Sequence, residues 1–250
     1  MEELCGRTIL VTGGSGGIGA TLSVAFAAAG ARVAVHAHSS IDRAEATVAE
    51  IDAAGGAAMA VAADVSDPDQ VEEMIATVGE FGGGKIEGLV NCAGAYPVTP
   101  FDELTPAIWR QVLAANLDGP FYCALAALPW LRAADRARVL HVGSGTVDLG
   151  TPGLAPYIAA KSGLVGLTRA MARDLGADDI GVNCLVPSLV ETETADRTFG
   201  EVWDITVAAQ AVGRRQQPAD LVDAALFLCS PRAEWITGQT VHVDGGLVMR

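Results

Sequence analysis

Basic residues are scarce in this chain of 250 residues, with 16 lysines and arginines against 30 aspartates and glutamates. The formal net charge of −14 argues against a nucleic-acid-binding protein, because such binding needs a basic surface to replace phosphate counterions. The same charge disfavours docking on an anionic membrane. Its ordinary interpretation is solubility. We therefore expect neither a nucleic acid nor a membrane among the partners.

The chain also lacks paired cysteines, and its four histidines are not spaced as metal ligands. The five cysteines include no Cys-x-x-Cys pair and lie mostly in apolar stretches. They are typical of small buried side chains in a reducing compartment rather than of a disulfide framework or a zinc site. The N-terminus has no basic region of the kind a signal peptide needs, and no uninterrupted apolar run reaches membrane-spanning length. We expect a cytoplasmic protein without a metal site.

Short apolar runs alternate with helical patterns along the whole chain, which is 50% hydrophobic. The expected strands are residues 8–11, 32–35, 57–62, 86–90, 138–142, 181–185 and 240–243. The expected helices are residues 18–29, 41–54, 68–79, 106–131, 156–175 and 218–228. Several of these strands are too uniformly apolar to have a face in water, as expected of parallel strands covered on both faces. The pattern predicts an α/β fold, with one domain over residues 1–250 built on a doubly wound parallel sheet of about seven strands.

Residues 188–213 break the alternation and are expected to be irregular. The segment contains two large aromatics, Phe199 and Trp203. Its five acids are Glu191, Glu193, Asp196, Glu201 and Asp204. A long irregular segment in a compact domain is usually a functional lid or a disordered loop, and aromatics are unusual in a purely solvating loop. We favour a substrate lid with its aromatics toward the substrate; the alternative is that they are fixed in a subunit interface.

The first expected strand runs into a glycine-rich loop, residues 12–19 (TGGSGGIG), and a helix begins at about Ile18. Glycines let the backbone turn sharply and let a pyrophosphate approach without a Cβ in the way. The helix N-terminus adds unpaired N–H groups and a positive dipole end. Such a loop alone could be a tight turn. After the first strand of an α/β chain it predicts a dinucleotide site.

The second expected strand ends in VHAHSS, residues 35–40, which contains no acid. Enzymes of this type that prefer NAD place an acid here to bind the ribose 2′-hydroxyl, whereas a 2′-phosphate favours cations or hydroxyls. His38, Ser39, Ser40 and Arg43 could hold that phosphate. This favours NADP as the cofactor, with NAD as the alternative. An ordinary polar strand end would explain the same residues without any cofactor.

Tyr157 and Lys161 stand one turn apart on one face of an expected helix. A free tyrosine titrates near pH 10 and is a poor base at neutral pH. A positive charge at about 5 Å, at an effective dielectric of about 20, stabilises phenolate by roughly 3 kcal/mol and lowers the pKa by about 2, while burial opposes it. Ser144 follows the strand 138–142, where its hydroxyl could hydrogen-bond a substrate oxygen. Together they predict proton transfer at a substrate oxygen.

These motifs together resemble the short-chain dehydrogenase/reductase family, over essentially the whole chain. The resemblance implies a Rossmann fold, an NAD(P)-dependent oxidoreductase and a homo-oligomer, either a tetramer or a dimer. The catalytic residues it implies are Asn116, Ser144, Tyr157 and Lys161. The cofactor-binding residues expected from the motifs and the resemblance are Gly13, Ser15, Gly17, Ile18, Gly19, His38, Ser39, Asp64, Val65, Asn91, Ala93, Gly94, Tyr157, Lys161, Pro187 and Thr192.

Each of these residues takes its role from the resemblance. Tyr157 would be the acid/base group, Ser144 would polarise the substrate oxygen, and Lys161 would bind the ribose and tune Tyr157. Asn116 would hold a water linked to the lysine, and Thr192 would reach the nicotinamide carboxamide. The departures from the family pattern are Gly16, His38, Cys92, Gly143 and Ser188. They affect cofactor preference and loop shape, and none removes a catalytic group.

The activity we expect is hydride transfer between a nicotinamide and a carbonyl or secondary alcohol of a small molecule. One alternative is reduction of a 3-oxoacyl group on acyl carrier protein. Such carriers are acidic, so acidic residues at the site mouth would oppose docking. We expect Asp135 and Asp178 at helix ends near that mouth, with Arg132, Arg136 and Arg173 nearby. A non-catalytic dinucleotide sensor or scaffold is an alternative of another class, since fold does not fix function.

Overall fold

The computed structural model describes residues 4–249, with the exception of the Glu201 side chain. Seven parallel strands form one sheet in the order β3-β2-β1-β4-β5-β6-β7. The strands are β1 (Thr8–Thr12), β2 (Arg32–Ala37), β3 (Ala57–Ala62), β4 (Gly88–Asn91), β5 (Arg138–Val142), β6 (Gly181–Pro187) and β7 (Thr240–Val243). The predicted fold class, a doubly wound parallel sheet of about seven strands, is confirmed.

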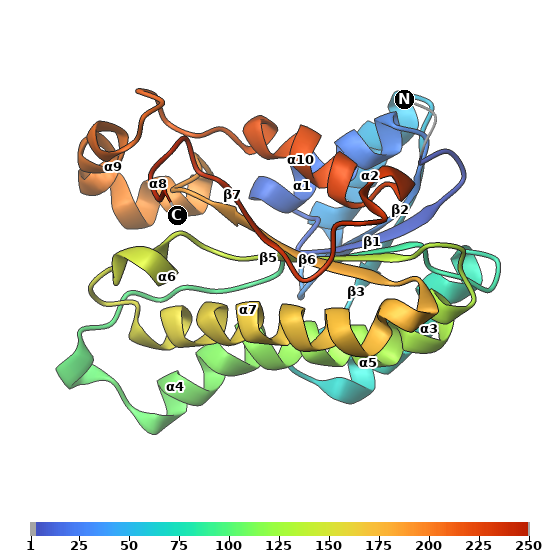
Figure 1. Cartoon of the computed structure of the whole chain (residues 1–250), viewed down its shortest axis with the longest axis horizontal. Helices are drawn as coiled ribbons and strands as arrows, with labels where there is room; N and C mark the ends of the chain where they lie inside the picture. The colour runs from blue at the N-terminus through green and yellow to red at the C-terminus, as the bar shows by residue number, and fades with distance from the viewer. Residues whose placement is uncertain (1–3, 250) are drawn as a thin grey trace.

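Helices cover both faces of this sheet, which gives three layers in Figure 1. The α-helices are α1 (Gly17–Ala28), α2 (Ile41–Ala53), α3 (Pro68–Phe81), α4 (Pro106–Leu113), α5 (Gly119–Arg132), α6 (Thr146–Leu149), α7 (Ala155–Leu175), α8 (Glu193–Phe199), α9 (Trp203–Ala209) and α10 (Val222–Leu228). The shorter turns are η1 (Phe101–Glu103), a π-helical η2 (Ala114–Asp118), η3 (Gly176–Asp178), η4 (Gly200–Val202), η5 (Pro218–Leu221) and η6 (Pro231–Ala233).

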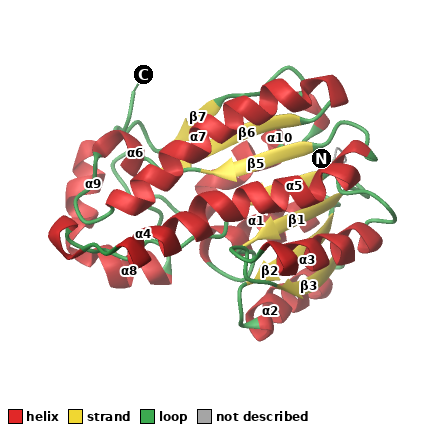
Figure 2. Cartoon of the chain, turned by 90° about the horizontal axis from the view of Figure 1, so that it is seen from below, coloured by secondary structure: helices red, strands yellow, loops and turns green. Residues whose placement is uncertain are grey.

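The side-chain alternation of the strands divides the core into two clusters. On one face, Ile9 and Val11 pack with α1, α2 and α10. On the other, Leu10 packs with α3, α5 and α7, which lie across the strands in Figure 2. Neighbouring residues of a strand point to opposite faces, so a strand buried on both faces must be apolar at every position. This explains the unbroken apolar runs of the sequence.

The direction in which successive strands are added to the sheet changes between β1 and β4. From β1 it adds β2 and β3 on one side, and from β4 it adds β5, β6 and β7 on the other. The crossovers therefore diverge at the carboxyl ends of β1 and β4, and a crevice opens there. The segments α4, α6, α8 and α9 all lie at this end of the sheet in Figure 1.

Two of the expected elements differ from the structure. Residues 188–213 are not irregular, because they contain α8, η4 and α9. The Thr192 hydroxyl caps α8 by accepting a hydrogen bond from the Ala195 amide at 3.2 Å, and Glu193 pairs with Arg197 one turn later. The expected helix 106–131 is interrupted by η2, whose wide π turn contains Asn116.

The helical stretch Pro106–Arg132 is long and apolar enough to cross a membrane by length and composition, the one such stretch in residues 4–249. It lies against α3 and α7 and against strands β4 and β5. A core helix of a globular fold passes the same test. Its packing here is that of a helix in the outer layer of the sandwich.

Gly79 sets the distance between α3 and α5. A Cβ added there would lie 2.3 Å from two ring atoms of Trp130, whereas one added at Gly166 in α7 would have no neighbour within 4 Å. We expect Gly79→Ala to lower the free energy of unfolding by about 1–3 kcal/mol, because the ring must move in a packed interface. Gly166→Ala, the matched control, should raise it by about 0.5–1 kcal/mol through helix propensity. Urea unfolding measures both, and equal effects would contradict this packing.

Candidate active site

The glycine loop between β1 and α1 is too tight for side chains at its key positions. Gly13 and Gly17 have φ angles of +68° and +51°, in the left-handed region that favours glycine. A Cβ on Gly19 would lie 2.1 Å from the Gly13 carbonyl oxygen, and one on Gly13 would lie 2.9 Å from the Ala93 Cα. The loop therefore exposes backbone at the start of a helix, which suits a dinucleotide pyrophosphate.

Two buried side chains hold this loop, and sequence reasoning gave neither a role. The Gly13 amide donates to His36 Nδ1 at 3.0 Å, and His36 Nε2 faces the Ala63 carbonyl at 2.9 Å. Burial lowers the pKa of His36, so a neutral ring can accept at Nδ1 and donate at Nε2. Thr12 Oγ1 accepts from the amides of Cys92 and Ala93, both at 3.1 Å, which ties β1 to the chain beyond β4.

At the tip of β2, the residues proposed for a 2′-phosphate are exposed. His38 Nε2 lies 3.5 Å from an Asp64 carboxylate oxygen. Asp64 also accepts from the Ser66 amide and hydroxyl, and the hydroxyl bond is the main cause that lowers the pKa of Asp64. The Arg43 guanidinium lies against the glycine loop. A Cβ added to Gly16 would lie 2.9 Å from Arg43 Nη2. A cation therefore stands at the glycine loop, where the sequence gave Arg43 only as one of four candidates.

Tyr157 and Lys161 lie on α7 and face the same cavity. Lys161 Nζ lies 5.6 Å from the centroid of the Tyr157 ring and donates to the Val142 carbonyl at 2.8 Å. Only 3% of Lys161 is exposed. The helical spacing thus brings a buried cation beside the phenol, as the sequence predicted.

The expected lowering of the Tyr157 pKa is not found in this structure. Burial raises the pKa of Tyr157, and the strongest opposing cause is a hydrogen bond with Ser144 rather than the charge of Lys161. Burial also lowers the pKa of Lys161 itself. The two groups are desolvated together, so the ammonium does not offset the cost of a buried phenolate.

Ser144 and Asn116 complete the cluster around Tyr157. Ser144 Oγ lies 2.9 Å from Thr146 Oγ1 at the start of α6. Asn116 Nδ2 donates to the carbonyls of Ala95 and Val112, whereas its Oδ1 is buried and has no hydrogen-bond partner among the described residues. The π turn η2 directs this oxygen toward Gly94. A Cβ added to Gly94 would lie 2.5 Å from Asn116 Oδ1 and 3.8 Å from Lys161 Nζ.

The remaining expected cofactor residues divide into three groups by position. Ile18, Gly94, Pro187 and Thr192 line the same cavity as Tyr157. Val65 packs against Gly119 in the core, and the Asn91 amide hydrogen-bonds His141 inside the sheet. Ser15 lies in the loop before α1, and Ser39 is exposed beyond β2. The side chain of Asn91 therefore points into the sheet rather than into the cavity.

The cavity has a volume of about 200 Å³ and lies at the carboxyl ends of β4, β5 and β6. Three of its walls come from the loop after β4, from α6 and from α8, including Tyr96, Leu149 and Phe199. Trp203, expected to face the substrate with Phe199, is instead buried and lies under the Arg215 guanidinium, 4.6 Å from the ring centroid. Only one of the two lid aromatics reaches the cavity.

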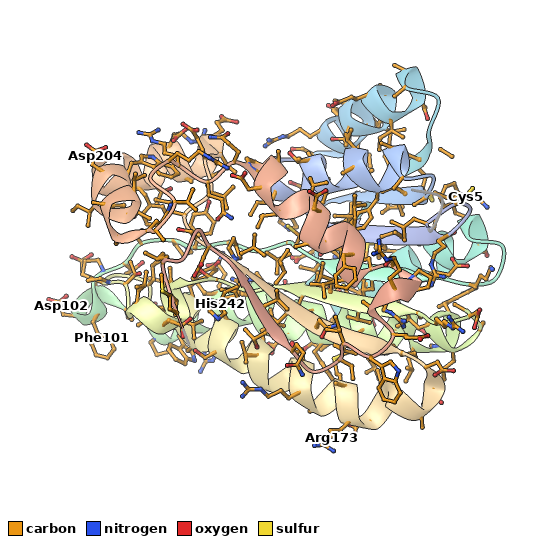
Figure 3. The ribbon with its side chains drawn as sticks, turned by 45° about the horizontal axis from the view of Figure 1, so that its top comes forward. Cys5, Phe101, Asp102, Arg173, Asp204 and His242 are labelled. Atoms are coloured by element: carbon orange, nitrogen blue, oxygen red, sulfur yellow. The ribbon has the colours of Figure 1, made fainter. Side chains whose placement is uncertain are left out.

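The expectation that Asp135 and Asp178 lie near the mouth of the site is wrong. Asp135 follows α5 and precedes β5, and Asp178 follows α7 and precedes β6, so both lie at the amino edge of the sheet. In Figure 3 that is the end marked by Cys5, while Asp102 and Asp204 mark the end that holds α8 and α9. Helices of a parallel sheet end where the next strand begins, which is the edge opposite the crevice.

Comparisons with known proteins agree with this geometry. Residues 13–248 match the family model described as enoyl-(acyl carrier protein) reductase. The 3-oxoacyl-[acyl-carrier-protein] reductase FabG of Staphylococcus aureus strain Mu50 is 35% identical, over 97% of this chain and 98% of its own. A dehydrogenase/reductase structure from Sinorhizobium meliloti 1021 has a TM-score of 0.94 at 35% identity, covering 99% and 97% of the two chains. The angucycline C-6 ketoreductase LanV, solved with bound NADP, gives 0.92 at 31% identity, covering 98% and 96%.

The fold, the glycine loop and the cavity define a nucleotide-binding oxidoreductase of the doubly wound class. The chain belongs to the short-chain dehydrogenase/reductase family. It is an NAD(P)-dependent oxidoreductase that acts on carbonyl and alcohol groups.

We expect His36→Leu to weaken binding of NADPH and NADH equally, by about tenfold or about 1.4 kcal/mol each, because the loop loses the acceptor of its Gly13 amide. The control is His38→Ala, at an exposed position, which should affect NADPH more than NADH. Fluorescence titration of each reduced cofactor measures the dissociation constants. A His36 variant that discriminates between the two cofactors would contradict this assignment.

Proposed function

We propose that this protein reduces a ketone, or oxidises the corresponding secondary alcohol, of a free small molecule, with Tyr157 as the acid/base group. The observation that carries the proposal is the convergence of Asn116, Ser144, Tyr157 and Lys161 on one buried cavity at the carboxyl ends of the strands. The glycine loop that suits a dinucleotide borders the same cavity through Ile18. A nicotinamide cofactor bound at that loop would bring the hydride donor close to the proposed proton donor.

The nicotinamide of a bound cofactor supplies or accepts the hydride. In the reducing direction, Ser144 donates a hydrogen bond to the substrate oxygen and Tyr157 gives that oxygen its proton. A tyrosine whose pKa is raised by burial is protonated at neutral pH, which is the form that this step requires. Lys161 would bind the cofactor ribose and order the phenol, and a water between Asn116 and Lys161 would give Asn116 Oδ1 the partner that it lacks among the described residues.

The cofactor we propose is NADP, with NAD as the alternative. No acid ends β2, and the Arg43 guanidinium lies beside Gly16 at the glycine loop. A 2′-phosphate on the adenosine ribose would meet that cation together with His38 and Ser39. Asp64 lies beside His38, with a carboxylate oxygen 3.5 Å from His38 Nε2.

A second candidate function is reduction of 3-oxoacyl groups on acyl carrier protein, which the name of the Staphylococcus aureus relative favours. The charge at the crevice end weighs against it, because Asp102 and Asp204 stand exposed there and would repel an acidic carrier. A non-catalytic sensor would not require the cavity to gather a phenol, an ammonium and a hydroxyl.

Residues 188–213 supply the lid of this proposal. Phe199, Val202 and Thr206 of this segment line the cavity, so movement of α8 and α9 would open it to solvent. Of its acids, Glu193 and Asp196 are exposed, and Glu193 and Glu191 pair with Arg197 and Arg215, respectively. A lid with this division excludes water from the hydride path when it closes. In this proposal the lid belongs to a single domain, residues 1–250.

We also propose that the protein is a homo-oligomer, a tetramer or a dimer, in the reducing cytoplasm. The five cysteines are free thiols, which suits that compartment. β7 is an edge strand, and exposed edges are normally covered. Trp109, Phe121 and Leu125 leave an apolar surface on α4 and α5, which a second copy of the chain would bury.

Tyr157→Phe tests the proposed chemistry, because phenylalanine keeps the ring and removes only the proton carrier. We expect turnover of ketones to fall by about 100- to 10,000-fold, with the cofactor dissociation constant unchanged within about twofold. Steady-state assays of NADPH oxidation and cofactor titration give the two numbers. Turnover within threefold of the parent enzyme would remove Tyr157 from the mechanism.

Arg43→Ala and Ala37→Asp test the cofactor preference. Loss of the guanidinium should weaken NADPH binding by about tenfold, which is the effect of losing one charge-assisted hydrogen bond. NADH binding should be unchanged. An aspartate at residue 37 should reverse the preference, because it accepts from the ribose hydroxyls and repels a 2′-phosphate. A parent enzyme that binds NADH tenfold more tightly than NADPH would refute the NADP assignment.

A further inference from the structure

The cavity offers a substrate no counter-charge. Of the described residues that line it, Lys161 alone carries a charged side chain. Its ammonium donates to the Val142 carbonyl and is assigned to the ribose and to Tyr157. A carboxylate or phosphate on the substrate would therefore lose its water without gaining a partner, which is strongly unfavourable. The electrostatics select an uncharged substrate.

The hydroxyl groups of the wall are mostly occupied by the protein itself. Thr206 Oγ1 donates to the Val202 carbonyl at 2.9 Å, and Ser188 Oγ donates to Gln210 at 2.8 Å. Thr146 Oγ1 lies 2.9 Å from Ser144 Oγ. A substrate rich in hydroxyls would find few free partners away from the reacting oxygen. The walls therefore favour an apolar substituent.

Two aromatic rings, from segments far apart in the sequence, form one side of this cavity. Tyr96 and Phe199 stack with their centroids 5.9 Å apart and their planes 20° apart. On its other side, Tyr96 meets the ring of Tyr157 edge to face, with centroids 5.7 Å apart. The Thr192 side chain lies beside the Tyr96 hydroxyl and opposes the rise that burial causes in the pKa of Tyr96. We call Tyr96 and Phe199 the aromatic pair.

The position of the aromatic pair determines which part of a substrate it contacts. A carbonyl oxygen at Ser144 and Tyr157 leaves two substituents on the carbonyl carbon, and Tyr96 is the ring that adjoins Tyr157. The pair is therefore within reach of one of these substituents. Aromatic rings pack in offset or edge-to-face arrangements at these centroid separations, so a planar group gains most from the pair.

We infer that the substrate is an uncharged ketone or secondary alcohol whose larger substituent is a planar apolar group, aryl or conjugated, packed against Tyr96 and Phe199. This substrate class rests on the proposed ketone reduction. It goes further by assigning specificity to two residues that take no part in proton transfer.

Three methyl ketones test both parts of the inference with NADPH and the intact enzyme, with neutral 4-acetylbenzamide as the size control for 4-acetylbenzoate. Acetophenone is neutral and planar, cyclohexyl methyl ketone is neutral and saturated, and 4-acetylbenzoate is planar and charged. We expect kcat/KM for acetophenone to be at least 100-fold higher than kcat/KM for 4-acetylbenzoate. It should be about 3- to 10-fold higher than kcat/KM for cyclohexyl methyl ketone. Turnover of 4-acetylbenzoate within threefold of acetophenone would overturn the inference.

Phe199→Leu tests the aromatic pair, since leucine keeps an apolar side chain and removes the ring. The ratio of kcat/KM for acetophenone to that for cyclohexyl methyl ketone should fall by about 3- to 10-fold. Phe101→Leu makes the same change at an exposed residue outside the cavity and should leave the ratio unchanged. A ratio that Phe199→Leu leaves unchanged would overturn the role of the pair.

Calorimetric binding of acetophenone to the Tyr157→Phe variant with NADP bound separates this inference from the proposed function. Binding without turnover of any ketone or alcohol by the parent enzyme would refute the function and support the pocket assignment. Turnover of charged or saturated ketones, with no binding of acetophenone, would refute the substrate class and leave the function standing. Absence of both binding and turnover would overturn both.

Discussion

Parallel pairing of β1 with both β2 and β4 is the constraint on which the rest of the site depends. Parallel strands bring all their carboxyl ends to one edge, and the change of direction between β1 and β4 keeps the connecting helices from closing over that edge. The glycine loop after β1 and the Ala93–Gly94 turn after β4 therefore meet, with room for no side chain between Gly13 and Ala93. Thr12 holds the two loops together, because its Oγ1 accepts hydrogen bonds from two backbone amides of the loop after β4.

The local pattern of the sequence was sufficient for the fold, whereas the cluster around Tyr157 needed the family resemblance as well. Strand and helix positions follow from hydrophobic periodicity, and Tyr157 and Lys161 follow from helical spacing. The role of His36 could not be predicted, because it depends on the Gly13 amide and the Ala63 carbonyl, which lie far apart in the chain. The π turn at Asn116 has no periodic signature either, because one wide turn leaves the apolar pattern of the long helix nearly intact.

Two errors have different physical causes. Residues 193–209 form short helices where a loop was expected, and hydrophobic periodicity does not reveal the Thr192 cap and the Glu193–Arg197 pair that support α8. The position of Asp135 and Asp178 can be predicted from the order of helices and strands. A residue between a helix and the next parallel strand must lie at the amino edge, so topology alone excludes it from the crevice.

Burial acts in one direction on every ionisable group around the proton donor. It raises the pKa of Tyr157, lowers that of Lys161 and raises that of Cys92 to about 11, so each group is driven toward its neutral form. The same low polarity that keeps Tyr157 protonated penalises a charged substrate, and both effects come from the apolar walls contributed by Leu149, Leu154 and the aromatic pair. An acyl carrier protein leaves its own charges outside and would present only a neutral thioester to such a cavity. Under the proposed function, the cavity would select neutral carbonyl compounds, and the exposed Asp102 and Asp204 at the crevice end would disfavour a carrier-bound one.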